Sequence, residues 1–466
     1  MNGNILRVGW LSLLTVLLLS LGLAYWGLVR APELQALPNN ARSVEFERKI
    51  QRGRILDRNG QVLAETKLTP DGPQRVYTYP PLAPVLGYSS LRYGQGGVEA
   101  AFNDELRGNV TGDSWEALRY KLLHQTPVGH DVTLTLDLRL QQAADQALGN
   151  RRGAIVLTST DGEILAMASH PSYDPNRFDE LFPQLSADPA APLVNRATQG
   201  LYPPGSTWKT MTLAAGLDSG VTQLSRVVND GAETLTVSGF PIRCNNNPPG
   251  VNSFDIAHAF GWSCNLTFAR MALETGEPRY TQYANAFQAS SSLPLEIPVA
   301  KAQLSRNPLT NPVLLASTGF GQGELLQTPL HMASLGATVA NDGRTPRPHL
   351  LLAIKDAEGR VLRGPDSGVL ASPIRPDSAA QVREAMRVAV ENGYASGAKV
   401  QGYAVGGKTG TAETGQATPP HAWFLGVAPL DEPRYAVSVL VENGGEGSQV
   451  AAPLAQRVLA AALKGP

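Results

Sequence analysis

Two side chains three positions apart supply the chemistry that this sequence offers most clearly. Ser206 and Lys209 follow Pro203, Pro204 and Gly205, a run typical of a loop that leads into a helix. On a helix, positions i and i+3 share a face, so the hydroxyl and the amine lie within reach of each other. A serine becomes a nucleophile when a base takes its proton, and a lysine can be that base if burial or a nearby cation lowers its pKa. We predict Ser206 as the nucleophile and Lys209 as its base.

A second motif places a hydroxyl and an amide on either side of Cys264. In an extended loop, Ser263 and Asn265 point the same way, so both side chains can face one cleft. The hydroxyl suits proton transfer and the amide suits binding of a substrate peptide. We expect Ser263 to be catalytic and Asn265 to bind substrate.

A third motif combines a cation with two hydroxyl groups. Lys408, Thr409, Gly410 and Thr411 follow a pair of glycines at 406–407. A lysine and two hydroxyls can hold a carboxylate, and glycines allow a substrate backbone to approach closely. We expect these four residues to bind substrate. Each motif occurs often by chance, and their combination is what makes the prediction specific.

Two pairs of strands, one before the motifs in the sequence and one after them, are expected to position these motifs. Residues 153–169 read as two strands joined at a turn around Asp161 and Gly162. Residues 421–429 and 435–442 read as a second pair, followed by an apolar helix at the C-terminus. Helical stretches and Pro- and Gly-rich loops alternate between them. This order predicts a mixed α/β (α+β) fold, with an antiparallel sheet covered by helices rather than a doubly wound parallel sheet.

Residues 51–150 read as a separate module. The apolar pairs 55–56 and 62–63 flank Asn59 and Gly60, a strong signal for a hairpin turn. Residues 134–148 pass from an alternating strand pattern into a helix. We place a domain boundary near residue 150.

The N-terminal region contains an apolar run from Val8 to Val29 that is flanked by Arg7 and Arg30. Its length matches a helix that spans a bilayer, and no small-residue cleavage site follows it. We predict a cytoplasmic tail at 1–7, a transmembrane anchor at 8–29 and a linker at 30–50. The flanking positive charges do not determine the orientation of the anchor.

The three motifs occur in the order found in penicillin-binding proteins and class A β-lactamases, which this chain resembles. The segments RGRILDRNG, from Arg52, and GQGGVEAAFNDELRG, from Gly94 to Gly108, are similar to blocks of class B penicillin-binding proteins. The resemblance implies a pedestal (dimerisation-like) domain at 51–150. It also implies a transpeptidase domain at 151–466 with a five-stranded antiparallel sheet flanked by helices. The arginines and acids of the N-terminal blocks are expected to pair between domains.

The resemblance also implies a function, a peptidoglycan D,D-transpeptidase that cross-links stem peptides through a serine acyl-enzyme. Ser206 would attack a terminal D-Ala-D-Ala peptide, Ser263 would pass a proton to the departing D-alanine, and Asn265 would hold the substrate amide. The lysine and threonines of the third motif would receive the terminal carboxylate, and the charge of Lys408 would help to keep Lys209 neutral. The backbone N–H groups of Ser206 and Thr411 would form the oxyanion hole.

The implied partners are stem peptides, β-lactam antibiotics, the membrane and a polytopic glycan-polymerising protein, with no cofactor. The implied location is the inner (cytoplasmic) membrane, crossed once, with the catalytic domain outside the cytoplasm. A serine β-lactamase is an alternative, although no ExxLN-like segment follows Asn265. A β-lactam-sensing receptor is another, although few residues precede the apolar run. Gly402, Gly407, Lys408 and Thr409 match a phosphate-binding loop, but the residues after them cannot open a helix.

Composition limits the remaining possibilities. The chain has 466 residues, 42% hydrophobic and 17% charged, and a net charge of −1, which gives no reason to expect nucleic acid. Its two cysteines have no metal-ligand spacing, so we predict no metal site. Cys244 and Cys264 either form a disulfide or remain a free thiol and a small buried side chain; the sequence leaves both open. The glycine-rich run 319–323 is expected to form a turn that lines the cleft. We assign no role to His331 or His421.

Overall fold

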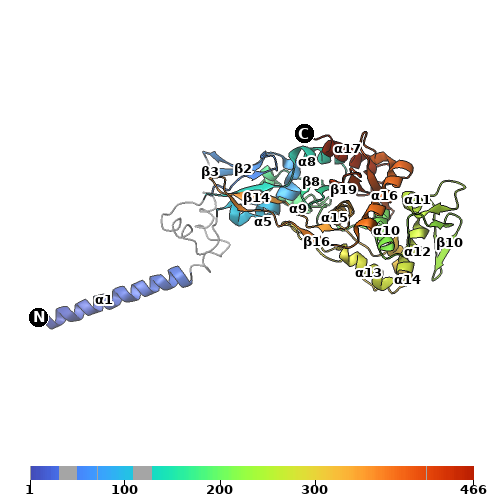
Figure 1. Ribbon diagram of the computed structural model, residues 1–466. Coiled ribbons are helices and arrows are strands. Elements are labelled where there is room, and N and C mark those ends of the chain that lie inside the picture. The colour runs from blue at the N-terminus through green and yellow to red at the C-terminus, as the bar shows by residue number, and fades with distance from the viewer. Residues whose placement is uncertain (1, 31–49, 71, 109–127, 416, 466) are drawn as a thin grey trace.

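The structure is a computed structural model that describes residues 2–30, 50–70, 72–108, 128–415 and 417–465 (Figure 1). A five-stranded sheet has the order β17-β18-β19-β7-β8, and every neighbouring pair is antiparallel. Its strands are β7 (Gly153–Ser159), β8 (Ile164–His170), β17 (Gly406–Ala412), β18 (His421–Ala428) and β19 (Tyr435–Val441). The predicted α/β (α+β) fold and its five-stranded antiparallel sheet are therefore confirmed. The third motif occupies β17, a strand at the edge of this sheet.

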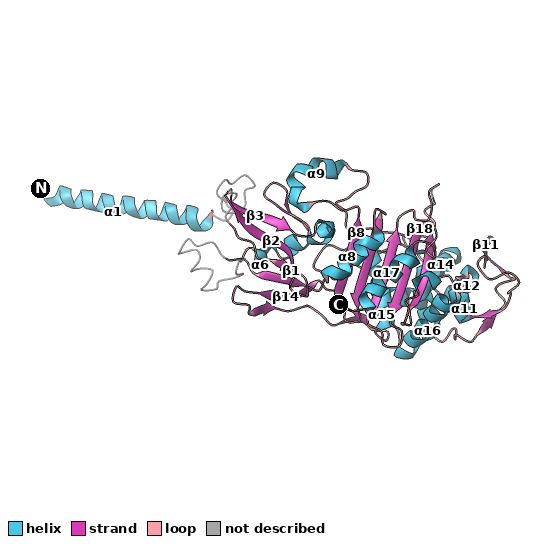
Figure 2. Cartoon of the chain, turned by 90° about the horizontal axis from the view of Figure 1, so that it is seen from above, coloured by secondary structure: helices cyan, strands magenta, loops and turns pink. Residues whose placement is uncertain are grey.

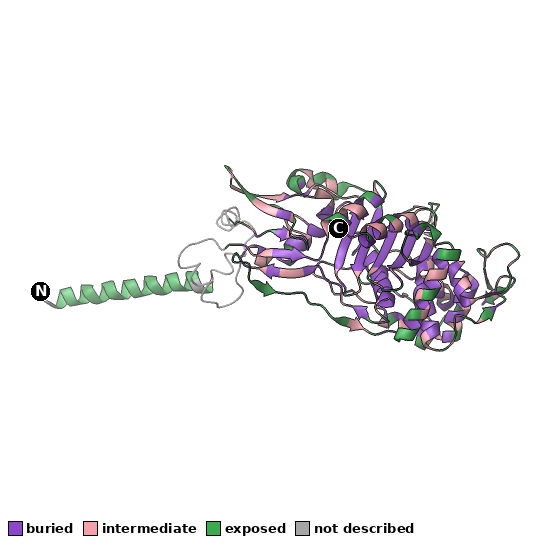
Figure 3. Cartoon of the chain, turned by 45° about the horizontal axis from the view of Figure 1, so that its top comes forward, coloured by how far each residue is buried: buried purple, intermediate pink, exposed green. Residues whose placement is uncertain are grey.

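Helices cover both faces of the five-stranded sheet (Figure 2). The covering helices are α8 (Leu138–Leu148), α15 (Pro329–Ala340) and α17 (Ala451–Leu463). Strand β7 shows why two layers are needed, because its side chains alternate between two apolar clusters. Ile155 and Leu157 belong to the cluster that contains Leu140 of α8. Ala154 and Val156 belong to the other, which contains Leu330 of α15. Buried residues concentrate in this sheet and the helices around it (Figure 3).

A helical region beside β17 contains the first two motifs. Its main elements are the 3-10 turn η4 (Gly205–Trp208), α10 (Lys209–Asp218), α11 (Ile256–Gly261), α12 (Asn265–Thr275), α13 (Glu277–Ala286), α14 (Pro312–Gly319) and α16 (Pro376–Asn392). Two pairs of short strands accompany them: β9 (Val227–Val228) with β12 (Phe254–Asp255), and β10 (Thr234–Val237) with β11 (Phe240–Arg243). A third pair, β13 (Thr345–Pro346) with β16 (Val369–Ala371), lies beside α15.

A six-stranded sheet with the order β15-β14-β6-β1-β2-β3 forms the core of the N-terminal module. Its strands are β1 (Ile55–Leu56), β2 (Val62–Thr69), β3 (Gly72–Tyr77), β6 (Asp131–Leu134), β14 (Leu351–Lys355) and β15 (Val361–Arg363). β1 and β2 form the antiparallel hairpin predicted around Asn59 and Gly60. β14 and β15 come from a part of the chain that follows α15, and the sequence patterns did not predict this.

Short helices and strands complete the N-terminal module and its contact with the five-stranded sheet. They are η2 (Pro80–Leu82), α4 (Ala83–Leu86), β4 (Ser89–Ser90), β5 (Gly94–Gln95), α5 (Gly97–Ala101), α6 (Asn103–Leu106) and, further along the chain, η3 (Pro175–Arg177) and α9 (Phe178–Ala187). Of the arginines in the block RGRILDRNG, Arg52 pairs with Glu99 inside the module, whereas Arg58 pairs with Glu163, beside β8. The expected pairing between domains therefore describes only some of these arginines.

The N-terminal helix α1 (Asn2–Ala24) continues as a short π-helix over Tyr25–Val29. Within it, Gly3–Gly27 is long and apolar enough to cross a membrane, with a mean hydropathy of 2.0 and no buried part among the residues described. The helix thus includes most of the segment expected as a tail. Of the expected linker 30–50, all except Arg30 and Ile50 lie outside the described residues.

Candidate active site

Ser206 lies in the 3-10 turn η4, and Lys209 is the first residue of α10. Gly205 has φ +55°, and a Cβ at this position would lie 2.9 Å from the carbonyl oxygen of Thr411. A glycine is needed here because the turn has a left-handed residue and packs directly on β17. The backbone thus brings the first motif against the third.

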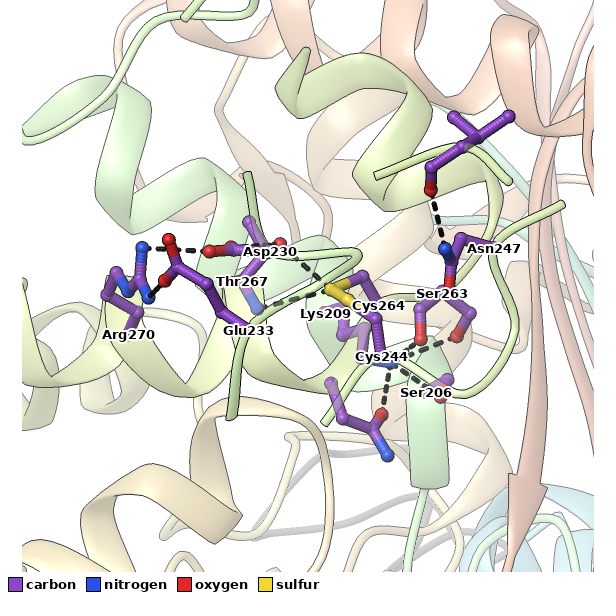
Figure 4. Close-up of a disulfide and its surroundings, with 12 residues drawn as sticks. Ser206, Lys209, Asp230, Glu233, Cys244, Asn247, Ser263, Cys264, Thr267 and Arg270 are labelled. Atoms are coloured by element: carbon purple, nitrogen blue, oxygen red, sulfur yellow. Dashed lines mark hydrogen bonds and ion pairs between the residues drawn. A yellow bond between two sulfur atoms is a disulfide. The ribbon is translucent and has the colours of Figure 1, made fainter. Parts of the chain in front are cut away.

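The amine of Lys209 is the centre of the site (Figure 4). Its Nζ lies 3.0 Å from Oγ of Ser206, 2.9 Å from Oγ of Ser263 and 2.7 Å from Oδ1 of Asn265. It also lies 2.7 Å from the carbonyl oxygen of Ser263. The structure therefore brings together the first and second motifs within hydrogen-bonding distance of one atom.

Burial determines the protonation of this amine. Lys209 is fully buried, which lowers its pKa well below the usual value, and the nearby Lys408 lowers it further. A neutral amine has a lone pair that can accept the hydroxyl proton of Ser206. The arrangement is that of an activated serine nucleophile with a lysine base.

The loop that carries Ser263 and Asn265 has a different conformation from the one expected. Ser263 has φ +61°, and Asn265 is the first residue of α12. The expected extended loop is wrong, because α11 ends in a tight turn in which the N–H of Cys264 donates to the carbonyl of Ala259. The turn and the start of α12 direct both side chains toward Lys209. Ser263 and Asn265 therefore face one site, as expected, although the loop is not extended.

Cys264 points away from these two residues and forms a disulfide with Cys244 (Figure 4). Of the two alternatives left open by the sequence, the disulfide is the one found. Sγ of Cys264 also accepts a hydrogen bond from the backbone N–H of Thr267, so it caps the first turn of α12. The disulfide links the turn that carries Ser263 to the segment that follows strand β11.

The residues of the third motif divide between the cleft wall and the interior. Thr409 and Thr411 line the cleft, as alternate positions of a strand should. Lys408 is fully buried behind them, and its Nζ donates to the carbonyl of Thr409 at 3.0 Å. Burial lowers the pKa of Lys408 to about 7. Gly410 also lies behind the wall, where a Cβ would be 2.9 Å from the carbonyl oxygen of Pro204.

The three motifs meet in a cleft of about 720 Å³. Ser206, Ser263 and Asn265 line it together with the two threonines. The glycine-rich run 319–323 also lines it, as predicted, through Phe320, Gln322 and Gly323. Further lining residues that the motifs did not predict are Phe240, Asn246, Val313, Ser317, Tyr394, Glu413, Glu446 and Ser448. Of these, only Glu413 is close enough in sequence to a motif to have been found from it.

The two histidines considered in the sequence lie outside this cleft. His331 is buried between the hydroxyl of Thr328 and the carbonyl of Ser291, and burial lowers its pKa to about 4. His421 accepts a hydrogen bond from the N–H of Asn443. Within the described ranges, no group of three or more His, Cys, Asp or Glu side chains is placed to hold a metal ion.

The fold and the site are those of a serine enzyme in which a buried lysine amine contacts the serine hydroxyl beside a five-stranded antiparallel sheet. Comparison with known proteins identifies the family within this class. The family model for the penicillin-binding protein transpeptidase domain matches residues 153–460. The model for the penicillin-binding protein A dimerisation domain matches residues 52–132.

Individual relatives agree with these matches. The peptidoglycan D,D-transpeptidase PbpA of Mycobacterium tuberculosis is 34% identical over 503 residues, covering 100% of both chains. The peptidoglycan D,D-transpeptidase MrdA of Acinetobacter baumannii is 30% identical and covers 80% of this chain and 61% of its own. A ceftriaxone acyl-enzyme complex of M. tuberculosis penicillin-binding protein A superposes with a TM-score of 0.84 at 33% identity, covering 90% of this chain and 100% of its own. The chain belongs to the class B penicillin-binding proteins.

Proposed function

We propose that this chain is a peptidoglycan D,D-transpeptidase that cross-links stem peptides through an acyl-enzyme on Ser206. The observation that carries the proposal is the contact of one fully buried amine, that of Lys209, with Ser206, Ser263 and Asn265. The D,D-transpeptidases among the relatives and the acyl-enzyme complex of a structural neighbour support it.

In the acylation step, Lys209 takes the hydroxyl proton of Ser206 while Oγ attacks the carbonyl carbon of the penultimate D-alanine. The backbone N–H groups of Ser206 and Thr411 stabilise the tetrahedral oxyanion; close packing of η4 on β17 supports this pairing. The proton passes from Lys209 through Ser263 to the departing nitrogen, since both oxygens contact Nζ. Terminal D-alanine leaves and an ester on Ser206 remains.

The other predicted residues bind the donor peptide. Asn265 receives the peptide amide, and Thr409 and Thr411 donate to the terminal carboxylate from the cleft wall. Gly410 allows η4 to lie close to β17. Lys408 acts from behind, as a positive charge that attracts the carboxylate and disfavours protonation of Lys209.

Mass spectrometry of the protein after exposure to a penicillin tests this function. We expect one covalent adduct on Ser206, and its loss in Ser206→Ala. Ser317→Ala is a matched control, because Ser317 lines the same cleft but its hydroxyl donates to backbone carbonyls of α14. An adduct that persists in Ser206→Ala would contradict the proposal. Rapid hydrolysis of the adduct would favour a β-lactamase.

We further propose that the catalytic part lies outside the cytoplasmic membrane, anchored by one crossing of α1. The apolar helix and the disulfide support this location, because disulfides persist in oxidising compartments. A polytopic glycan-polymerising partner would supply the glycan strands that carry the stem peptides, and it would contact α1 and residues 51–150. A C-terminal alkaline phosphatase fusion should be active, and purification in mild detergent should retain the partner. An inactive fusion would reverse the proposed orientation.

A further inference from the structure

We propose that Glu442 is a positioning residue for acylation: through the hydroxyl of Tyr202, it holds the segment that leads into Ser206 in its place beside Lys209. This inference rests on the proposed function, because it explains how the nucleophile of that reaction is kept in position. It adds two residues that none of the three motifs contains.

The segment 202–205 leads directly into the nucleophile, and its backbone is fixed at the first two residues. The N–H of Tyr202 donates to the carbonyl of Gln327 at 3.0 Å, and the N–H of Gln327 donates to the carbonyl of Tyr202 at 2.8 Å. The carbonyl of Pro203 accepts from the indole Nε1 of Trp423 at 3.0 Å. Because Trp423 belongs to β18, this segment is attached to the five-stranded sheet just before η4.

The side chain of Tyr202 attaches the same segment to a second strand of the sheet. Its hydroxyl donates to Oε1 of Glu442 at 2.7 Å. Glu442 directly follows β19, and its N–H donates to the carbonyl of Arg152 at 2.8 Å. A Cβ on Gly200 would overlap the ring of Tyr202, so the ring packs closely on the backbone that precedes it. The hydroxyl is therefore directed toward Glu442 by packing as well as by its hydrogen bond.

Two arginines hold the carboxylate of Glu442. Nε of Arg196 donates to Oε1 at 2.7 Å, and Nη2 of Arg152 lies 3.1 Å from Oε2. The side chain of Arg196 is only 4% exposed, and its other two nitrogens donate to the carbonyls of Ala190 at 2.6 Å and Ala191 at 3.1 Å. All three nitrogens of this guanidinium are therefore bonded, and the carboxylate that accepts from Tyr202 has a rigid support.

The protonation states of both groups favour their hydrogen bond. Burial opposes ionisation of Glu442, but the hydrogen bond from Tyr202 and the charge of Arg196 outweigh it, so the pKa of Glu442 is lowered. Burial raises the pKa of Tyr202, and the charge of Glu442 raises it further. The phenol thus keeps its proton while the carboxylate stays ionised. Hydrogen bonds to an ionised group are shorter and stronger than those between neutral groups.

Glu442 also connects the nucleophile to the strand of the third motif. The loop that follows Glu442 returns to β17, where the N–H of Gly447 lies 3.4 Å from Oγ1 of Thr411. A Cβ on Gly447 would overlap the carbonyl oxygen of Gly410, so this loop packs directly on the strand. One carboxylate therefore joins the segment that leads into Ser206 to the loop that packs on β17.

This arrangement affects the nucleophile rather than the ligand. Within the described ranges, neither Tyr202 nor Glu442 lines the cleft. Misplacing a reacting atom by about 1 Å can slow a reaction by about a hundredfold. Binding of the ligand before the reaction depends instead on the residues that line the cleft. Loss of the hydrogen bond should therefore change the rate of the chemical step and leave the affinity of the preceding complex unchanged.

The test is acylation of the full-length chain in detergent by a fluorescent penicillin, followed over a range of penicillin concentrations. It yields the limiting rate constant at saturating penicillin and the dissociation constant of the complex that precedes acylation. Tyr202→Phe keeps the ring and removes the hydroxyl, so we expect the limiting rate constant to fall by about tenfold. The dissociation constant should not change. Glu442→Gln should also lower the limiting rate constant, and the double variant should be no slower than the slower single variant, because both changes remove one interaction.

Tyr283→Phe is the matched control. The hydroxyl of Tyr283 donates to Oδ2 of Asp218 at 2.9 Å, and Asp218 is the last residue of α10, at the end remote from Lys209. This variant should keep the wild-type limiting rate constant.

Tyr202→Phe decides the inference alone if Glu442→Gln does not fold. A lower melting temperature with the wild-type limiting rate constant would reduce Tyr202 to a structural role and overturn the inference, leaving the proposed function intact. An increase in the dissociation constant alone also overturns it, as does an equal loss of rate in Tyr283→Phe. Failure of the wild-type chain to acylate at Ser206 removes the proposed function instead.

Discussion

Two buried amines control the charge of the active site at the scale of single residues. Lys209 and Lys408 are both fully buried, and burial lowers the pKa of each. In the proposed mechanism, Lys209 contacts the nucleophile and works as a base only when its amine is neutral. In the same mechanism, Lys408 acts through its positive charge, half of which is lost at a pH near its pKa of about 7. The two lysines should therefore respond differently to pH and to substitution.

Acylation by a penicillin should slow as the pH rises above about 7, because Lys408 then loses the proton that attracts the ligand carboxylate. Lys408→Ala should be slower at pH 6, by about tenfold to a hundredfold, and should lack this decline. Lys209→Ala should not acylate at any pH. Second-order rate constants measured with a fluorescent penicillin from acid to alkaline pH check these expectations. A decline that survives in Lys408→Ala would assign it to another group.

Local spacing predicted the contact of Ser206 with Lys209, because positions i and i+3 of a helix share a face. It could not predict how the second motif reaches the site. The left-handed conformation of Ser263 and the capping of α12 depend on the turn after α11 and on a disulfide with a residue 20 positions away. Glu446 was also missed as a lining residue of the cleft, since the packing of Gly447 on β17 holds its loop there.

At the scale of elements, close backbone packing fixes the position of η4, the turn that carries Ser206. Gly321 has φ +87°, and a Cβ there would overlap the carbonyl oxygen of Gly205 and lie 3.0 Å from Cβ of Trp208. The glycine-rich run 319–323 thus packs directly against the backbone of η4. Neither backbone can move without displacing the other, since interiors are close-packed.

Gly321→Ala should therefore slow acylation and lower the melting temperature. Gly402→Ala is a matched control with φ +85° and no atom near its Cβ position. Both variants have the cost of a left-handed alanine, about 1–2 kcal/mol. Only the first adds a clash with the nucleophile's turn. Equal effects of the two variants on acylation would mean that the contact with Gly205 does not position Ser206.

The disulfide should hold the second motif in place. It closes a loop with a sequence separation of 20, which stabilises the fold by about 3 kcal/mol in the chain-entropy model. We expect the double substitution of Cys244 and Cys264 to alanine to lower the melting temperature and to slow acylation. A reductant should have the same effect on the wild-type chain and none on the double variant. A reductant that slows both equally would show that it acts elsewhere.

Hairpins were the elements that the sequence predicted best. The turns at Asn59–Gly60 and Asp161–Gly162 join strands that pair as expected, because turn residues and strand patterns are local. The pairing of β14 with β6 was not predicted. Leu351 lies opposite Leu134 although more than two hundred positions separate them, and no local pattern records such a partner.

This long-range pairing governs behaviour at the scale of the whole molecule. The six-stranded sheet contains β14 and β15, which the chain reaches only after α15 has crossed the five-stranded sheet. Unfolding of the six-stranded sheet therefore releases a segment of chain that is continuous with the five-stranded sheet. We expect the two sheets to lose structure together, in one cooperative transition.

Glu99→Gln tests this coupling from helix α5, in the interior of the N-terminal module. Glu99 is fully buried and accepts from Nε of Arg52 at 2.9 Å and of Arg75 at 2.6 Å. Burial opposes its ionisation, yet the guanidinium groups of Arg75 and Arg52 hold its pKa below the usual value. Removing one partner of a buried ionic cluster costs about 3–5 kcal/mol. Because the folded-state pKa is lowered, the wild-type contribution is present above the unfolded value of 4.5 and is lost as the pH falls through the folded-state pKa.

The measurement is thermal unfolding at pH 7 and at pH 4, followed in parallel by circular dichroism and by loss of penicillin acylation. Glu99→Gln should lower both midpoints by the same amount at pH 7, and the difference from wild type should shrink at pH 4. Glu180→Gln is the control, since Glu180 forms an exposed ion pair with Arg177 and should change neither midpoint. If acylation survives to the wild-type temperature while the dichroism shows an earlier transition, the sheets unfold independently and the pairing of β14 with β6 does not couple them.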